Sequence, residues 1–239
     1  MTNILILTGA GISAESGLST FRDTEGLWKN HAVEEVCSAA GLATNPYQVH
    51  AFYDARRAQL PLVSPNPSHI ALAELEAQWI GQQRGQFTLC TQNVDDLHER
   101  GGSRNVLHVH GELASALCMS CGQRFMWKQD LPVAEDCPVC DEGALRPDVV
   151  LFGEAPYHRW KVEDRVARCD VFIAIGTSGN VHPAAGLVRL ARQSGAETIE
   201  VNLRPTANAD FRHVYEGPAS RQVSRLVQDL LARTYCTPF

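Results

Sequence analysis

The sequence predicts an α/β fold, a Rossmann-like parallel sheet that carries a small second domain. Three observations lead to this class: short apolar runs that end in small or polar residues, helical patterns between those runs, and two stretches that interrupt the alternation. Apolar runs without alternating polar residues are typical of strands buried on both faces. Their alternation with helices indicates a doubly wound sheet.

Four such runs are expected to form strands, at residues 4–7, 87–90, 171–175 and 198–201. They end respectively in Thr8-Gly9, Thr91-Gln92-Asn93, Gly176-Thr177-Ser178 and Asn202. Helical patterns cover residues 68–80 and 183–194. Because ligands of open parallel sheets bind at the carboxyl ends of the strands, these polar endings form the candidate site.

The two interruptions predict the small domain. Residues 26–67 form a helical module, and residues 112–147 form a second module that holds four of the eight cysteines. The sheet domain is then expected from residues 1–25, 68–111 and 148–239.

The cysteine spacing predicts a metal site. Cys118 and Cys121 are separated by two residues, as are Cys137 and Cys140, with fifteen residues between the pairs. Two such pairs suit one tetrahedral zinc, and four cysteines leave no open coordination position, so the zinc would be structural. The alternative is unpaired or disulfide-linked cysteines. The remaining cysteines, Cys37, Cys90, Cys169 and Cys236, are expected to be core or surface thiols.

The first strand is followed by Gly9-Ala10-Gly11-Ile12-Ser13-Ala14, which fits the dinucleotide fingerprint. A helix should follow, with its N-terminus toward a pyrophosphate; a plain tight turn is the alternative. No acidic residue ends a second strand about 20 residues on, as in dehydrogenases. The polar sets Gln92-Asn93-Val94-Asp95 and His108-Val109-His110 instead suit sugar hydroxyls and a carboxamide.

Composition excludes some partners and suggests a compartment. A net charge of −6 argues against binding to nucleic acid or anionic membranes. No apolar run approaches the roughly 18 residues that span a bilayer. The N-terminus shows no signal peptide, and eight cysteines without one indicate a reducing compartment, so cytoplasm is expected.

Together these motifs resemble the sirtuin family. The matching elements are residues 9–13, Ser16-Gly17, Phe21-Arg22, residues 91–95, His110-Gly111, the cysteine pairs, residues 146–154 and residues 176–178. They occur in the family's order, and the nearest resemblance is to bacterial CobB-like NAD-dependent protein deacylases of the class that prefers succinyl and malonyl groups.

The resemblance implies NAD as a consumed co-substrate, with His110 as the general base and Asn93 as the second catalytic residue, which orients ribose and water. Asp95 would pair with the nicotinamide carboxamide, and His108 would be structural. The implied nucleotide-binding set is Gly9, Ala10, Gly11, Ile12, Ser13, Phe21, Arg22, Gln92, Asn93, Asp95, Gly176, Thr177, Ser178, Asn202, Leu203 and Ala219.

The implied activity is protein-lysine deacylation, covering acetyl, succinyl and malonyl groups. Its products are nicotinamide, deacylated lysine and O-acyl-ADP-ribose, and its partners are acylated-lysine proteins or peptides. Two alternatives stay open: mono-ADP-ribosyl transfer, and a non-catalytic NAD-sensing or zinc adaptor module. The intact set of Asn93, Asp95 and His110 speaks against the second.

Tyr53 and Arg56 are the candidate residues for recognition of the acyl group. Three residues apart on a helix, they share a face, and a phenol with a guanidinium can bind a carboxylate. The pair resembles the mark of succinyl- and malonyl-preferring sirtuins, in which Cys37 stands at a position held by a small residue. The alternative is a packed tyrosine and a solvated arginine, which is also the expectation for Arg57. The resemblance further implies substrate contacts at Val149, Phe152 and Gly153.

Overall fold

A six-stranded parallel sheet forms the larger part of the molecule. The structure, a computed structural model, describes residues 1–18, 27–28, 31–143, 145–177 and 184–232. The strand order is β11-β10-β9-β1-β4-β5, with parallel pairing throughout. The strands are β1 (Ile4–Thr8), β4 (Phe87–Thr91), β5 (Val106–His108), β9 (Val171–Ile175), β10 (Glu197–Asn202) and β11 (His213–Glu216). This is the doubly wound order, and its switch point lies between β1 and β9.

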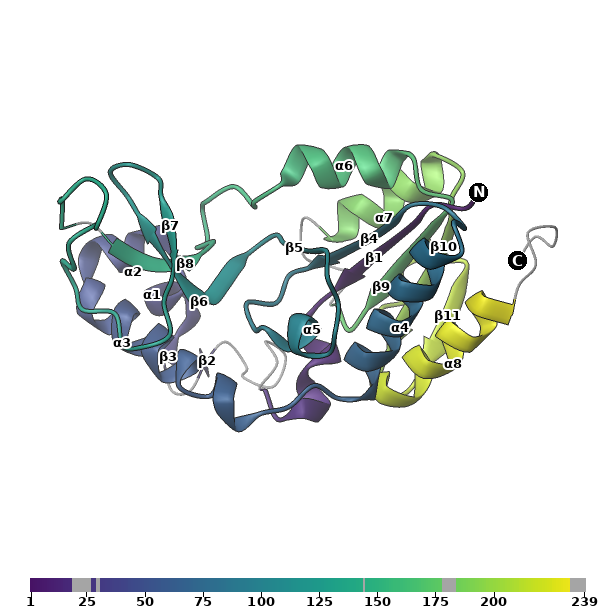
Figure 1. Cartoon of the computed structure of the whole chain (residues 1–239), viewed down its shortest axis with the longest axis horizontal. Helices are drawn as coiled ribbons and strands as arrows, with labels where there is room; N and C mark the ends of the chain where they lie inside the picture. Colours follow the sequence, from purple (N-terminus) through teal and green to yellow (C-terminus); the bar gives the residue numbers. More distant parts are fainter. Residues whose placement is uncertain (19–26, 29–30, 144, 178–183, 233–239) are drawn as a thin grey trace.

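Helices cover both faces of this sheet (Figure 1). α4 (Pro67–Gly81) and α8 (Ala219–Ala232) pack together on one face, and α6 (Arg159–Ala167) and α7 (Ala184–Gln193) pack together on the other. The short α5 (Leu97–Arg100) follows β4. Within the described residues, no helix is both long and apolar enough to cross a bilayer.

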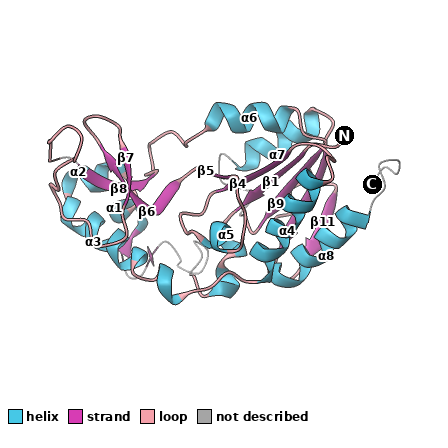
Figure 2. Ribbon diagram, in the orientation of Figure 1, coloured by secondary structure: helices cyan, strands magenta, loops and turns pink. Residues whose placement is uncertain are grey.

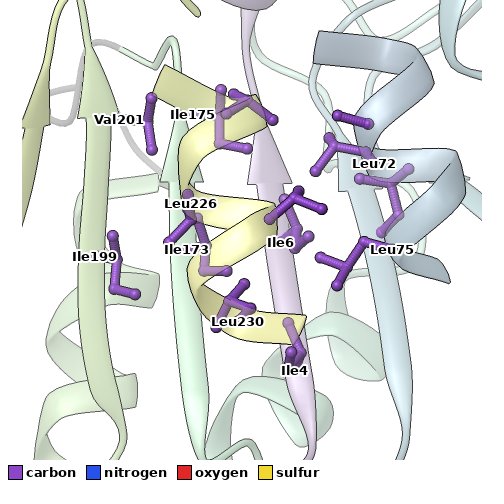
Figure 3. Close-up of a cluster of buried hydrophobic side chains, with 14 of the residues drawn as sticks. Ile4, Ile6, Leu72, Leu75, Ile173, Ile175, Ile199, Val201, Leu226 and Leu230 are labelled. Carbon is purple, nitrogen blue, oxygen red and sulfur yellow. The ribbon is translucent and has the colours of Figure 1, made fainter. Parts of the chain in front are cut away.

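Alternate residues of β1 supply the two halves of the core. Ile4 and Ile6 face α4 and α8 and join the cluster drawn in Figure 3, which includes Leu75 and Leu226. Leu5 and Leu7 belong to the opposite cluster, beneath α6 and α7. A strand buried on both faces needs the continuous apolar run seen in the sequence.

The small domain lies at one end of the sheet (Figures 1 and 2). It contains the three-stranded sheet β7-β6-β8, made of β6 (Gly111–Cys118), β7 (Arg124–Met126) and β8 (Leu145–Val149). Its remaining elements are β2 (Leu27–Trp28), β3 (His31–Ala32), α1 (Val33–Val36), α2 (Ala39–Thr44), α3 (Pro46–Arg57) and η4 (Leu60–Leu62). The proposed domain boundaries stay a prediction.

Arg57 corrects one expectation, since it is not solvated. Arg57 is only 3% exposed. Its guanidinium donates to the backbone carbonyls of Leu113 (2.6 Å) and Gln129 (3.2 Å). It also forms an ion pair with Asp54. Asp54 in turn accepts from the Leu131 backbone N–H at 3.1 Å. Arg57 therefore ties α3 to β6 and to the segment that follows β7.

The four predicted strands and both predicted helical stretches are confirmed, but two strands of the six-stranded sheet and the strands of the small domain were not predicted. β5 and β11 form the two edges of the sheet, and both are only partly buried, so neither has a continuous apolar run. The expectation of a helix directly after the glycine turn is wrong in kind. Two 3₁₀ turns, η1 (Ala10–Ile12) and η2 (Ala14–Ser16), follow β1 in its place.

Candidate functional site

The glycine turn closes against the end of β9. Gly9 and Gly11 donate their backbone N–H groups to the carbonyls of Ile175 and Gly176, each at 2.9 Å. A Cβ on Gly11 would lie 2.7 Å from Gly176 Cα, and a Cβ on Gly9 would lie 2.9 Å from the Gly176 carbonyl oxygen. Glycine is therefore required at positions 9 and 11 because the backbone of the turn comes very close to that of Gly176 at the switch point of the sheet.

Ser13 is the centre of a buried polar network beside that turn. Its Oγ accepts from Asn93 Nδ2 at 3.0 Å and donates to Asp95 Oδ2 at 3.1 Å. His69 Nδ1 accepts from the Asn66 backbone N–H, so its Nε2 carries the proton and faces Ser13 Oγ at 3.4 Å. The fold brings Ser13, Asn93 and Asp95 together, as the sequence predicted. The sequence did not predict that His69 would join them.

Burial raises the pKa of Asp95, and hydrogen bonds from the Leu97 backbone and Ser13 partly offset this effect. Burial lowers the pKa of His69 to about 4, so this histidine is neutral at pH 7. A neutral His69 can hold Ser13 without adding a positive charge to the site.

His110 lies between β5 and β6, next to the end of β4. Its Nδ1 lies 3.1 Å from the Gln92 carbonyl oxygen, which can only accept, so Nδ1 carries the proton. Burial lowers the pKa of His110, and the hydrogen bond to Gln92 opposes the shift only in part. The neutral imidazole therefore keeps Nε2 as a proton acceptor at the carboxyl edge of the sheet.

The backbone around His110 is fixed by β8 and the residue that follows it. Its carbonyl accepts from the Val150 N–H at 2.9 Å, and Gly111 follows at φ +83°. A Cβ on Gly111 would lie 2.1 Å from the Asp148 carbonyl oxygen, so no other residue fits there. Asp148, which is fully buried, accepts from Arg124 Nε (2.6 Å) and from the Tyr157 hydroxyl (2.9 Å).

The second half of the sheet presents Thr177 and Asn202, both buried. Asn202 Nδ2 donates to the Thr177 carbonyl at 2.8 Å and to Glu200 Oε1 at 3.2 Å. Glu200 also accepts from the Thr206 backbone N–H, and its role was not predicted. Leu203 follows β10 with its side chain exposed, and Ala219 begins α8.

The predicted acyl-recognition pair faces the small domain's apolar core. Tyr53 is packed with Cys37, Val149 and Leu113, and Arg56 stacks over the Phe52 ring at 5.7 Å. Burial raises the pKa of Tyr53 and lowers that of Arg56. The charge of Asp95 is among those that favour protonated Arg56, which places the pair near the Ser13 network.

The segment after β8 borders the same cluster. The Phe152 backbone N–H donates to the Cys37 carbonyl at 2.7 Å, and its carbonyl accepts from Ala39 N–H at 3.2 Å. The Phe152 side chain is 54% exposed, although it is a large apolar group. Gly153 follows at φ +97°, a conformation that favours glycine. Phe21, Arg22 and Ser178 lie outside the described residues.

The four predicted cysteines converge. Their sulfur atoms all lie within 4.8 Å of one another, with Cys118 Sγ 3.7 Å from Cys140 Sγ and Cys121 Sγ 3.8 Å from Cys137 Sγ. Zinc–sulfur bonds of about 2.3 Å at tetrahedral angles separate sulfurs by about 3.8 Å. A disulfide would need about 2.05 Å. The cluster fits one structural zinc, and Cys37, Cys90 and Cys169 are buried free thiols, while Cys236 lies outside the described residues.

A family model described as the Sir2 family matches residues 9–183 of the chain. A Bdellovibrio bacteriovorus protein named NAD-dependent protein deacylase is 50% identical over 233 residues, which cover 96% of this chain and 97% of that protein.

Solved structures share the fold over nearly the whole chain. The crystal structure of a Sir2 homolog–NAD complex matches with a TM-score of 0.84 and 38% identity, covering 96% of this chain and 90% of that one. A structure described as Sir2 bound to acetylated peptide matches with a TM-score of 0.76 and 26% identity, covering 97% of this chain and 94% of that one.

Proposed function

This chain belongs to the Sir2 family, and we propose that it is an NAD-dependent protein-lysine deacylase that removes acetyl, succinyl and malonyl groups. The products would be nicotinamide, the free lysine and O-acyl-ADP-ribose. NAD supplies the ribose carbon to which the acyl oxygen is transferred. The single observation that carries the proposal is His110, a neutral imidazole fixed through Nδ1 to the carbonyl of Gln92, the residue that precedes Asn93.

His110 acts as the general base. Because Nδ1 donates to the Gln92 carbonyl, Nε2 is the atom that takes a proton from a ribose hydroxyl. The lowered pKa keeps Nε2 unprotonated at pH 7. Val150 donates to the His110 carbonyl and Gly111 packs against β8, so the ring enters the reaction already oriented.

Asn93 and Asp95 form the nicotinamide side of the site. Asn93 donates its amide nitrogen to Ser13, which leaves its side-chain oxygen to accept from a ribose hydroxyl or water. Asp95 takes a hydrogen bond from Ser13 and from Leu97 N–H, so the carboxyl group is held in one orientation for a carboxamide. Gly9 through Ser13, Gln92, Gly176, Thr177, Asn202, Leu203 and Ala219 complete the nucleotide-binding set, with Phe21, Arg22 and Ser178.

Tyr53 and Arg56 are proposed to bind the carboxylate of succinyl and malonyl lysine. The Arg56 guanidinium lies over the Phe52 ring, and burial lowers its pKa, so a buried carboxylate would stabilise its charged form through a bidentate hydrogen bond. Val149, Phe152 and Gly153 line the path of the acyl-lysine. The exposed Phe152 ring supplies apolar area for the lysine stem.

The surroundings of the site support a wider proposal. The sheet domain of residues 1–25, 68–111 and 148–239 would bind NAD, and the helical module (26–67) and zinc module (112–147) would hold the acyl-lysine against it. The substrates would be acylated proteins or peptides of the cytoplasm. The net charge of −6 supports an enzyme without direct contacts to nucleic acid or anionic membranes.

The test is an assay of the purified protein with NAD and matched peptides that carry acetyl-, succinyl- or malonyl-lysine. Mass spectrometry of the products should show free lysine together with O-acyl-ADP-ribose. ADP-ribose attached to protein, with no deacylated peptide, would contradict the proposal and favour mono-ADP-ribosyl transfer.

A further inference from the structure

His108, the last residue of β5, lies between two hydrogen-bond acceptors. Its side chain is 7% exposed, its Nδ1 lies 3.1 Å from the Asn93 carbonyl oxygen, and its Nε2 lies 2.9 Å from Glu99 Oε1. A carbonyl oxygen and an ionised carboxylate can only accept. Both ring nitrogens must therefore carry protons, which makes the ring an imidazolium.

The surroundings favour this charged form. Burial opposes the charge of His108, but the hydrogen bond and charge of Glu99, together with Glu112 on β6, outweigh it, so the pKa of His108 is raised. Glu99 is 42% exposed, which lets water stabilise its own negative charge.

Three other titratable groups interact with the charge of His108. Asp95 carries a charge of opposite sign when it is ionised, so it favours the imidazolium. His98 on α5 and His158 before α6 would oppose it if they were protonated. Burial lowers the pKa of His98 to about 3 and lowers that of His158, so both are neutral near pH 7 and do not oppose it.

The two partners of His108 stand at opposite ends of one segment. Asn93 follows β4, and Glu99 lies in α5, so a single ring bridges the start and the end of the loop that carries Asp95. Loss of the proton from His108 would turn a lone pair toward an acceptor and release one end of this loop.

We propose that His108 is a positioning residue, an imidazolium that holds the Asn93 carbonyl against Glu99 and so keeps the nicotinamide-side loop in its active arrangement. The proposal rests on the proposed deacylase function. It predicts that kcat falls at high pH as His108 loses its proton, because Asn93 and Asp95 are no longer held in place. The substrate KM should change much less, because His108 itself does not touch the acyl-lysine.

The first experiment compares pH profiles of kcat for the wild type, Glu99→Gln and Glu197→Gln. Glu99→Gln removes the negative partner of His108 and should move the high-pH limb down by about one pH unit. Glu197→Gln is the matched control, because Glu197 pairs with His213 at 3.3 Å at the opposite end of the sheet strands. His108→Gln should lower kcat about tenfold or more and abolish the limb. Superimposable profiles for Glu99→Gln and Glu197→Gln would overturn the proposal.

The second experiment needs no turnover and separates this proposal from the proposed function. Uniformly nitrogen-labelled protein is titrated by NMR, with His108→Gln used to assign the His108 signal. His108 should titrate above 6.5, its ordinary value, and the side-chain amide signals of Asn93 should move with the same midpoint. An inactive wild type that shows this coupling would refute the deacylase and keep the positioning role. A His108 midpoint at or below 6.5, or Asn93 signals that ignore it, would refute the positioning role.

Discussion

His108 and His110 donate their Nδ1 protons to consecutive backbone carbonyls, those of Asn93 and Gln92, each at 3.1 Å. The pKa values of the two rings nevertheless shift in opposite directions. Glu99 faces the second nitrogen of His108 and raises its pKa, whereas no charged group among the described residues shifts the pKa of His110, which burial lowers. Two histidines separated by one residue thus hold the same loop while only one of them can act as a base.

The first prediction concerns the acid side of the pH profile. The general base must be neutral, so activity should be lost as pH falls through the pKa of His110. Because that pKa is lowered, the midpoint of kcat/KM should lie below the ordinary 6.5. His110→Asn should remove the limb and at least about a hundredfold of the activity. A midpoint above 6.5 would contradict the assignment.

The second prediction concerns acyl selectivity. Arg56→Met should reduce kcat/KM for succinyl-lysine peptide about thirtyfold, because a buried carboxylate loses its charged partner. Turnover of acetyl-lysine peptide should change less than about threefold. Parallel assays of both peptides measure the ratio. Equal losses on the two substrates would remove the case for carboxylate recognition.

The third prediction separates Arg57 from its neighbour. Arg57→Met should lower the free energy of unfolding by about 3 kcal/mol, because it leaves the partly buried Asp54 without its cation and the Leu113 carbonyl without its donor. The ratio of succinyl to acetyl activity should stay as in the wild type. Denaturant unfolding and the two peptide assays provide the comparison. A changed acyl ratio with unchanged stability would reverse the roles given to Arg56 and Arg57.

The fourth prediction concerns the glycine turn. Gly11→Ala would place a Cβ 2.7 Å from Gly176 Cα. This overpacking should lower the free energy of unfolding by about 1–3 kcal/mol and weaken NAD binding. Gly81→Ala is the control, since nothing lies within 4 Å of its Cβ at the end of α4. That variant should keep or slightly increase stability. Calorimetric titration with NAD tests both; a Gly11→Ala protein that binds as the wild type does would contradict the packing argument.

The fifth prediction concerns the metal. Purified protein should contain one zinc per chain, and Cys137→Ser should lose it and unfold at lower temperature, because three thiolates cannot close the tetrahedral site. Cys169→Ser is the matched control, a buried thiol that lies outside the cluster. Elemental analysis and thermal unfolding measure the two effects. Full zinc content in Cys137→Ser would exclude this cysteine as a ligand.

The sequence was enough to predict those features whose structure depends only on residues close together in the chain. The apolar run Ile4 to Leu7 can only be satisfied between two layers, and it forms the central strand. The cysteine pairs define the metal cluster, because each pair fits a single turn. The carboxyl-edge rule placed Asn93 and Asp95 beside Ser13, since parallel strands end on the same side.

The sequence by itself therefore determined the central strands, the glycine turn, the cysteine cluster and the family motifs. The tertiary structure decided the partners of each titratable group. Arg57 is buried because Leu113 and Gln129 approach it from another module, and the pKa of His108 is raised because Glu99 reaches it from α5. Neither fact is visible in the residues next to Arg57 or His108, because burial and charge depend on distances between segments that only folding brings together.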